Sequence, residues 1–90
     1  MGFEWDERKR EGNLRSHKVD FIDVLSLFDG ATLEIVDDRF NYRGTRIRSL
    51  GEVDGRVYVV VYTWRGGNRR IISARKANAR ERRTYYARQR

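Results

Sequence analysis

The densest hydrophobic pattern in the chain lies in residues 57–75, which read VYVVVYTWRGGNRRIISAR. The first half is β-branched or aromatic at nearly every position, which is typical of a strand that is covered on both faces. Gly66, Gly67 and Asn68 then provide residues that accept the positive φ angles of a tight turn. The pattern predicts a central strand followed by a hairpin.

The run RRIISAR after this turn alternates between polar and apolar residues, which predicts how the returning strand is oriented. Period-two geometry places Ile72 and Ala74 towards the core. The opposite face then carries Arg69, Ile71, Ser73 and Arg75. A strand of this kind delivers guanidinium groups to one surface, where they can hold phosphates.

Two helices are predicted before the sheet. Asp6 is a suitable N-cap for a charged helix over residues 7–16. In the run VDFIDVLSLFDG, apolar residues recur at i, i+3, i+4 and i+7 from Phe21, which predicts a helix that ends near Gly30. Residues 3–5 alternate between aromatic and polar side chains, so we expect a short strand or an apolar clamp there.

Two further strands are predicted over residues 33–37 and 45–53. The second carries Arg46 and Arg48 on one face and Ile47 on the other. Asp54-Gly55 predicts a two-residue hairpin from this strand into the central strand. The loop from Arg39 to Gly44 between the two strands has no predicted role.

The chain closes with a predicted helix over residues 79–88, because Asn78 and Glu81 have the spacing of a capping box. The expected fold class is therefore α+β, with two N-terminal helices, an antiparallel four-stranded meander sheet and a C-terminal helix. Ninety residues are enough for a single domain with one core.

Composition narrows the function classes. The chain has no cysteine, and His17 is its only histidine, so a zinc site would need carboxylates for nearly all its ligands. We therefore expect no metal and no cofactor. The N-terminus lacks the positive flank and apolar run of a signal peptide, and no stretch reaches membrane-spanning length. These features predict a cytoplasmic protein without a membrane partner.

Positive charge is concentrated at the C-terminal end. Residues 65–90 carry ten basic side chains and one acidic side chain, whereas residues 1–64 carry ten basic and twelve acidic ones. A local arginine field favours a polyanionic partner, and the planar guanidinium matches phosphate oxygens better than an ammonium group does. The alternative is a solvated face that keeps the protein soluble.

Three segments resemble a known family. They are FEWDERKREGNLRSHKVDF near the start, VVYTWRG in the centre and RRIISARKANARERRTYY near the end. Together they cover almost the whole chain, and they resemble the BrnT family of bacterial toxins from type II toxin-antitoxin systems. The resemblance implies a RelE-like ribonuclease fold, inhibition of translation by RNA cleavage, and neutralisation by a cognate DNA-binding antitoxin. It also implies a heterotetramer or larger complex that binds operator DNA through the antitoxin.

RNA cleavage without a metal needs a base for the ribose 2′-hydroxyl, cations for the charge that develops on the phosphate, and a donor for the leaving oxygen. The candidate bases are His17, Glu81, Glu34 and a lysine with a lowered pKa. His17 has the most suitable ordinary pKa, and its structural alternative is a helix-end histidine that binds backbone carbonyls. Capping of the last helix is the structural alternative for Glu81.

The cations are expected where the last strand leads into the terminal helix. Arg75, Lys76 and Arg80 are predicted to converge beside Arg69 on one phosphate-sized area, with Arg75 as the main catalytic candidate. Tyr85 is a candidate proton donor or base-stacking residue, or it packs the helix onto the sheet.

The hairpin end adds two candidate RNA contacts. Trp64 can stack on an unpaired base or close the end of the core, and Arg65 can contact a phosphate. Two other functions remain open on the sequence: a nucleic-acid-binding module without catalysis, and a toxin of the same fold that acts on gyrase.

Overall fold

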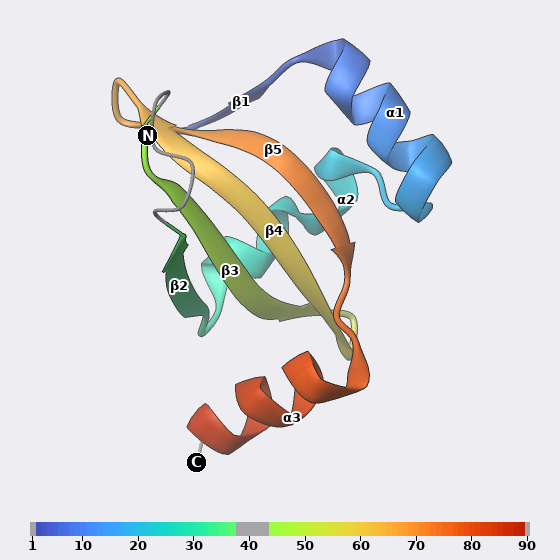
Figure 1. The fold of residues 1–90 in the computed structure, drawn as a ribbon, viewed down its shortest axis with the longest axis vertical. Helices are drawn as coiled ribbons and strands as arrows, with labels where there is room; N and C mark the ends of the chain where they lie inside the picture. The colour runs from blue at the N-terminus through green and yellow to red at the C-terminus, as the bar shows by residue number, and fades with distance from the viewer. Residues whose placement is uncertain (1, 38–43, 90) are drawn as a thin grey trace.

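The computed structural model describes residues 2–37 and 44–89, which contain a curved sheet and three α-helices (Figure 1). The strands are β1 (Phe3–Trp5), β2 (Leu33–Asp37), β3 (Arg46–Val53), β4 (Arg56–Arg65) and β5 (Asn68–Lys76). Their order in the sheet is β1-β5-β4-β3-β2. The predicted α+β class and the antiparallel meander from β2 to β5 are confirmed. Most of the loop from Arg39 to Gly44 lies outside the described residues.

The expected four-stranded sheet is wrong, because β1 adds a fifth strand that runs parallel to β5. Phe3 pairs with Arg69 and Trp5 pairs with Ile71. The alternation in residues 3–5 indicated a short strand, but its partner lies more than sixty positions away in the sequence. The sheet is therefore mixed within the described part of the chain.

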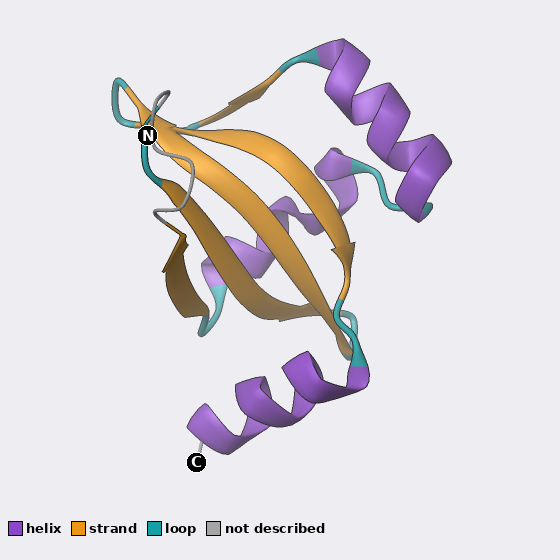
Figure 2. Ribbon diagram, viewed as in Figure 1, coloured by secondary structure: helices purple, strands orange, loops and turns teal. Residues whose placement is uncertain are grey.

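The helices are α1 (Glu7–His17), α2 (Phe21–Val24) and α3 (Ala79–Arg88), arranged around the sheet (Figure 2). The Asp6 cap is confirmed, since its side chain accepts a hydrogen bond from the backbone N–H of Arg8. The single helix expected after residue 20 is wrong, because α2 ends at Val24 and continues as a 3₁₀ helix, η1 (Leu25–Asp29). A 3₁₀ turn aligns residues three apart, and Val24 and Leu27 both lie buried against the sheet. Within the described residues, no helix is both long and apolar enough to cross a membrane.

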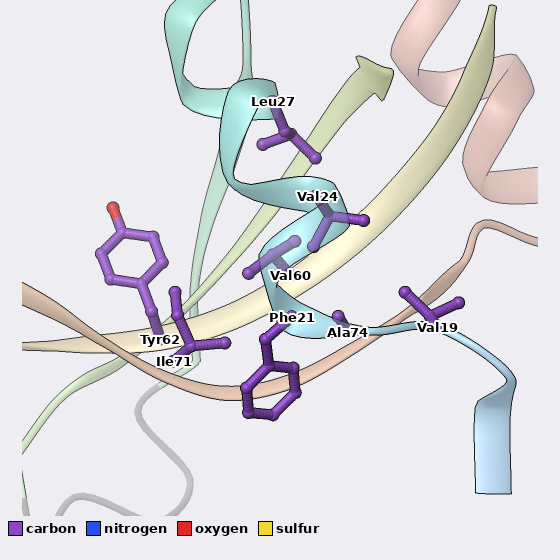
Figure 3. Close-up of a cluster of buried hydrophobic side chains, with 8 residues drawn as sticks. All are labelled: Val19, Phe21, Val24, Leu27, Val60, Tyr62, Ile71 and Ala74. Carbon is purple, nitrogen blue, oxygen red and sulfur yellow. The ribbon is translucent and has the colours of Figure 1, made fainter. Parts of the chain in front are cut away.

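Hydrophobic clusters lie on both faces of the sheet. The α2 face, as we call it, is covered by α2 and η1 and holds the cluster drawn in Figure 3. Its buried members are Val19, Phe21, Val24, Leu27, Val60, Tyr62, Ile71 and Ala74. The opposite side, the α3 face, carries Leu50, Val57, Val59, Ala77 and Tyr85. The central strand β4 contributes to both clusters, which agrees with its nearly continuous apolar sequence.

A β-bulge in β5 changes the predicted orientation of this strand. Val61 pairs with Ser73, but the next residue, Tyr62, pairs with Ile71, so Ile72 is an extra residue. Ile71 and Ala74 are both buried on the α2 face, and the prediction that Ile72 points into the core is wrong. An inserted residue reverses the alternation on one side of a bulge.

Asn13 binds the edge of β5 through its side chain. Its Nδ2 donates hydrogen bonds to the carbonyl oxygens of Ala74 at 2.7 Å and Val19 at 2.8 Å, and its Oδ1 accepts one from the N–H of Ala74 at 3.1 Å. The side chain is buried, and β1 pairs only with the part of β5 from Arg69 to Ile71. Asn13 therefore satisfies backbone groups that β1 does not reach.

Candidate active site

Arg75 and Glu81 form a bidentate ion pair where β5 leads into α3. The two terminal nitrogens of Arg75 each lie 2.8 Å from a carboxylate oxygen of Glu81. The Glu81 side chain is 16% exposed and that of Arg75 is 35% exposed. The Arg75 guanidinium lowers the pKa of Glu81, and this effect outweighs the opposing effect of burial. Glu81 is therefore ionised at neutral pH.

The start of α3 also fixes Glu81. Its Oε1 accepts a hydrogen bond from the backbone N–H of Asn78, and the Oδ1 of Asn78 accepts one from the N–H of Glu81, both at 2.8 Å. This arrangement confirms the predicted capping box. The N–H of Ala77 donates to the carbonyl oxygen of Val57 in β4, so the connection from β5 to α3 is tied to the sheet. The Glu81 carboxylate is therefore held by the guanidinium group of Arg75 and by the backbone N–H of Asn78.

An open cavity of about 390 Å³ lies beside this ion pair, between α3 and the strands β2 and β3. It is lined by Ile35, Arg48, Leu50, Asn78, Arg80, Glu81 and Thr84. The charge of Arg48 contributes to the lowered pKa of Glu81. In the described ranges, no carboxylate forms an ion pair with Arg48 or Arg80. The cavity therefore presents one carboxylate and two guanidinium groups that have no ion-pair partner among residues 2–37 and 44–89.

Arg48 is the charged residue of this cavity that was not predicted from the sequence to be a site residue. Its Nε is buried and has no hydrogen-bond partner among residues 2–37 and 44–89. The alternation in the predicted strand 45–53 already put Arg48 on a charged face. The packing of α3 over β3, which brings Arg48 to Glu81, was not predictable from local sequence patterns.

His17 does not line this cavity. It ends α1 and lines a separate shallow depression with Lys9, Gly12, Asn13, Ser16 and Ile72. Of the predicted catalytic residues, His17 is alone there, because Arg75, Glu81 and Tyr85 do not contribute to the lining of the depression. The structure thus places His17 at the end of α1, apart from the other predicted catalytic residues.

Glu34, another candidate base, also lies apart from Glu81. It belongs to the α2 face, where its Oε2 accepts a hydrogen bond of 2.9 Å from the hydroxyl of Tyr62. Burial raises the pKa of Tyr62, the neighbouring Arg69 lowers it in part, and the hydrogen bond to Glu34 raises it again, so that the pKa lies above its ordinary value. Of His17, Glu34 and Glu81, Glu81 is therefore the candidate base that shares a cavity with guanidinium groups lacking a carboxylate partner in the described part of the chain.

Tyr85 and Lys76 do not line the cavity either. Tyr85 is 5% exposed in the cluster under α3, and its hydroxyl donates a hydrogen bond of 3.0 Å to the carbonyl oxygen of Ala31. Packing of α3 accounts for this position, as the alternative interpretation of Tyr85 proposed. Lys76, at the end of β5, lines a different depression that also contains Arg56 and Arg82.

The expected convergence of Arg69 with Arg75 is wrong. Arg75 lies on the α3 face with Glu81, whereas Arg69 lies on the α2 face, because the bulge at Ile72 reverses the alternation between them. The guanidinium carbon of Arg69 lies 4.3 Å from the ring centre of Phe28, 5.2 Å from that of Tyr62 and 4.7 Å from that of Trp64.

The other predicted RNA contacts, besides Lys76 in its own depression, separate into two groups. Arg80 lines the cavity with Glu81, whereas Trp64 lies directly opposite Arg69 in the hairpin, and the exposed Arg65 follows Trp64 at the end of β4. A search of the described residues finds no group of three or more histidine, aspartate or glutamate side chains suited to a metal ion.

The cavity has the components for chemistry on a phosphodiester. A carboxylate that stays ionised can accept a proton, and neighbouring guanidinium groups can stabilise negative charge on phosphate oxygens. Arg75 has both terminal nitrogens bound to Glu81, so Arg48 and Arg80 are the cations available to an incoming anion.

Comparison with known proteins identifies the family of this chain. Residues 5–81 match the family model described as the ribonuclease toxin, BrnT, of type II toxin-antitoxin system. The crystal structure of the Brucella abortus ribonuclease toxin, BrnT, superposes with a TM-score of 0.67 and 30% sequence identity. The match covers 87% of this chain and 97% of the Brucella chain. Among curated proteins, no sequence matches. Since the family model spans most of the sequence, this chain belongs to the BrnT family of ribonuclease toxins of type II toxin-antitoxin systems.

Proposed function

We propose that this protein is a metal-independent endoribonuclease that cleaves RNA in the cavity formed by Arg48, Arg80 and Glu81. The observation that carries the proposal is the fixed Glu81 carboxylate, which faces two guanidinium groups without carboxylate partners in the described part of the chain. Membership of the BrnT family gives the proposal its substrate, since the family is one of ribonuclease toxins.

In the proposed reaction, the Glu81 carboxylate accepts the proton of a ribose 2′-hydroxyl. The resulting 2′-oxygen attacks the adjacent phosphorus, and the bond from phosphorus to the 5′-oxygen breaks. Arg48 and Arg80 stabilise the negative charge on the non-bridging oxygens. The leaving 5′-oxygen takes a proton from water, and the hydroxide that remains removes the proton from Glu81, which restores the carboxylate. The products are a 2′,3′-cyclic phosphate and a free 5′-hydroxyl. Arg75 holds Glu81 in position and keeps it ionised.

The lowered pKa of Glu81 has two opposing effects on this role. It ensures that the base is unprotonated at neutral pH, but it also makes the carboxylate a weaker proton acceptor. A phosphate held by Arg48 and Arg80 compensates, because those charges stabilise the transition state.

The proposal includes a partner and a cellular outcome. Cleavage of RNA by this protein would inhibit translation, and a cognate antitoxin would neutralise it in a complex that binds DNA through the antitoxin. The type II family supports a protein partner of this kind. Acidic side chains on the antitoxin are expected to meet the basic segment 65–90, where ten residues are basic and one is acidic.

The test incubates the purified protein with single-stranded RNA in excess chelator and identifies the products. We expect cleavage that leaves 2′,3′-cyclic phosphate ends. Arg48→Ala should lower the cleavage rate by about a hundredfold, and Glu81→Gln by ~10²–10⁴-fold. Glu11→Gln is the matched control, because it removes one carboxylate from an exposed position of α1.

Thermal unfolding of each variant separates lost chemistry from lost folding, which matters because Glu81 also caps α3. Full activity in a folded Glu81→Gln protein would show that another group is the base. A gel shift without cleavage products would identify a binding module in place of a nuclease.

A further inference from the structure

An array of aromatic rings on the α2 face takes no part in the proposed reaction. Phe3 of β1, Phe28 of η1, and Tyr62 and Trp64 of β4 follow one another with ring centroids 5.6, 5.3 and 5.6 Å apart. Tyr62 stands edge-on to both Phe28 and Trp64, with interplanar angles of 89°. The array reaches the end of the sheet where β4 turns into β5.

Arg69 lies against three of these rings, those of Phe28, Tyr62 and Trp64. The Nε of Arg69 is buried and lacks a hydrogen-bond partner within residues 2–37 and 44–89, and no carboxylate there forms an ion pair with Arg69. Cation–π contacts hold the guanidinium group in place, but they do not cancel its charge. Arg69 therefore remains able to bind an anion.

Trp64 lies at the exposed end of the array, with 47% of its surface accessible. Its orientation is fixed by the edge-on contact with Tyr62, whose hydroxyl is in turn bound to Glu34. An indole that is already held in one orientation loses little conformational entropy when a flat partner stacks on it. The site thus offers an aromatic surface next to a positive charge without a carboxylate partner among the described residues.

We infer that Trp64 and Arg69 form a nucleotide-binding subsite for single-stranded RNA, in which an unpaired base stacks on Trp64 and a neighbouring phosphate binds Arg69. Stacking on aromatic side chains beside basic residues is the usual mode of single-strand recognition. The inference rests on the proposed function, which supplies RNA as the ligand.

The position of this subsite constrains the path of the RNA. Arg75 pairs with Val59 and Arg69 pairs with Trp64, five residues further along β4, which is about 17 Å in a strand. The two arginines also lie on opposite faces of the sheet. A short RNA can therefore occupy the cavity or the subsite, whereas only a longer strand that passes around the sheet reaches both.

The first measurement uses the full-length protein and a single-stranded RNA oligonucleotide with 2′-O-methyl groups throughout, which cannot be cleaved by attack of a 2′-hydroxyl. Trp5→Phe leaves Trp64 as the only tryptophan of the chain, so its fluorescence reports directly on stacking. We expect the fluorescence to be quenched as this RNA is added. Unchanged fluorescence at saturating RNA would overturn the inference.

The second measurement is the affinity of variants for the same labelled RNA. Trp64→Ala should weaken binding by about tenfold, and Trp64→Phe should weaken it less because a ring is retained. Arg69→Lys should also weaken binding, since the ammonium group keeps the charge but does not stack on the rings. Arg15→Ala is the control, because it removes one positive charge from the exposed end of α1.

The outcomes separate this inference from the proposed function. Wild-type affinity in folded Trp64→Ala and Arg69→Lys proteins, or an equal loss in Arg15→Ala, would overturn the subsite while RNA cleavage still stands. Weaker binding in the Trp64 and Arg69 variants of a protein that cleaves no RNA would support the subsite and contradict the nuclease.

Discussion

The two faces of the sheet hold arginine in different ways. On the α3 face, both terminal nitrogens of Arg75 are bound by Glu81. On the α2 face, Arg69 contacts three aromatic rings, and no carboxylate of the described residues pairs with it. A guanidinium group that is neutralised in an ion pair can orient its partner, whereas one held by rings keeps its charge for a ligand. The environment of an arginine, more than its proximity to a site, therefore indicates its role.

The largest effect is expected from the removal of Arg75 on the α3 face. We expect Arg75→Ala to lower RNA cleavage by about a hundredfold or more, because Glu81 loses the group that orients its carboxylate. The measurement is the single-turnover cleavage rate of a defined RNA, with thermal unfolding to verify folding. Full activity in a folded Arg75→Ala protein would show that the site lies elsewhere.

Substitutions in the packed side chains of the two faces are expected to have a smaller effect, on the free energy of unfolding. A Cβ atom added at Gly51 would lie 2.5 Å from the Cγ of Leu27 on the α2 face, so Gly51→Ala forces the Leu27 side chain to move. We expect this change to lower the free energy of unfolding by about 1–3 kcal/mol. On the α3 face, Tyr85→Phe removes only the hydrogen bond to Ala31, which costs about 1 kcal/mol.

Urea unfolding of both variants measures this difference. The double variant Gly51→Ala with Leu27→Ala tests the contact directly, because the smaller side chain at position 27 leaves room for the new methyl group. The losses in free energy of unfolding of the two single variants should therefore not add. Strict additivity in the double variant would contradict the close contact between Gly51 and Leu27.

The smallest expected effect is the pH dependence of the Arg75–Glu81 pair. Since the pKa of Glu81 is lower in the folded protein than its ordinary value of 4.5, the pair stabilises the fold at pH values above 4.5. This contribution is lost as the pH falls through the lower folded pKa. We therefore expect the free energy of unfolding to fall less in Glu81→Gln than in the wild type between pH 6 and pH 3. The difference should be about as large as the contribution of a partly exposed ion pair. Identical pH profiles in denaturant unfolding would show that Glu81 is not linked to folding in this way.

Features that depend on neighbouring residues were predictable from the sequence. The capping box of Asn78 and Glu81 and the Asp54-Gly55 hairpin are confirmed, and both depend on residues within four positions. Asp54 and Gly55 have φ angles of 50° and 80°, as this type of turn requires. Because the capping box fixes where α3 starts, the sequence also predicted that Arg80 and Glu81 lie close to the end of β5.

Features that depend on distant residues were not predictable. The bulge at Ile72 is set by pairing with β4, and an uninterrupted alternation would have placed Arg69 and Arg75 on the same face. Arg48 reaches the cavity only because α3 packs over β3, a contact that no local pattern encodes. The pairing of β1 with β5 likewise joins residues at opposite ends of the chain.

The Asn13 side chain has a consequence for local unfolding and amide exchange. An asparagine side chain is an amide like the backbone, and here it takes the place that a neighbouring strand would occupy beside Ala74. The backbone amide of Ala74 is therefore a natural reporter in hydrogen exchange: it becomes exposed to solvent whenever α1 detaches, even while β5 stays in the sheet.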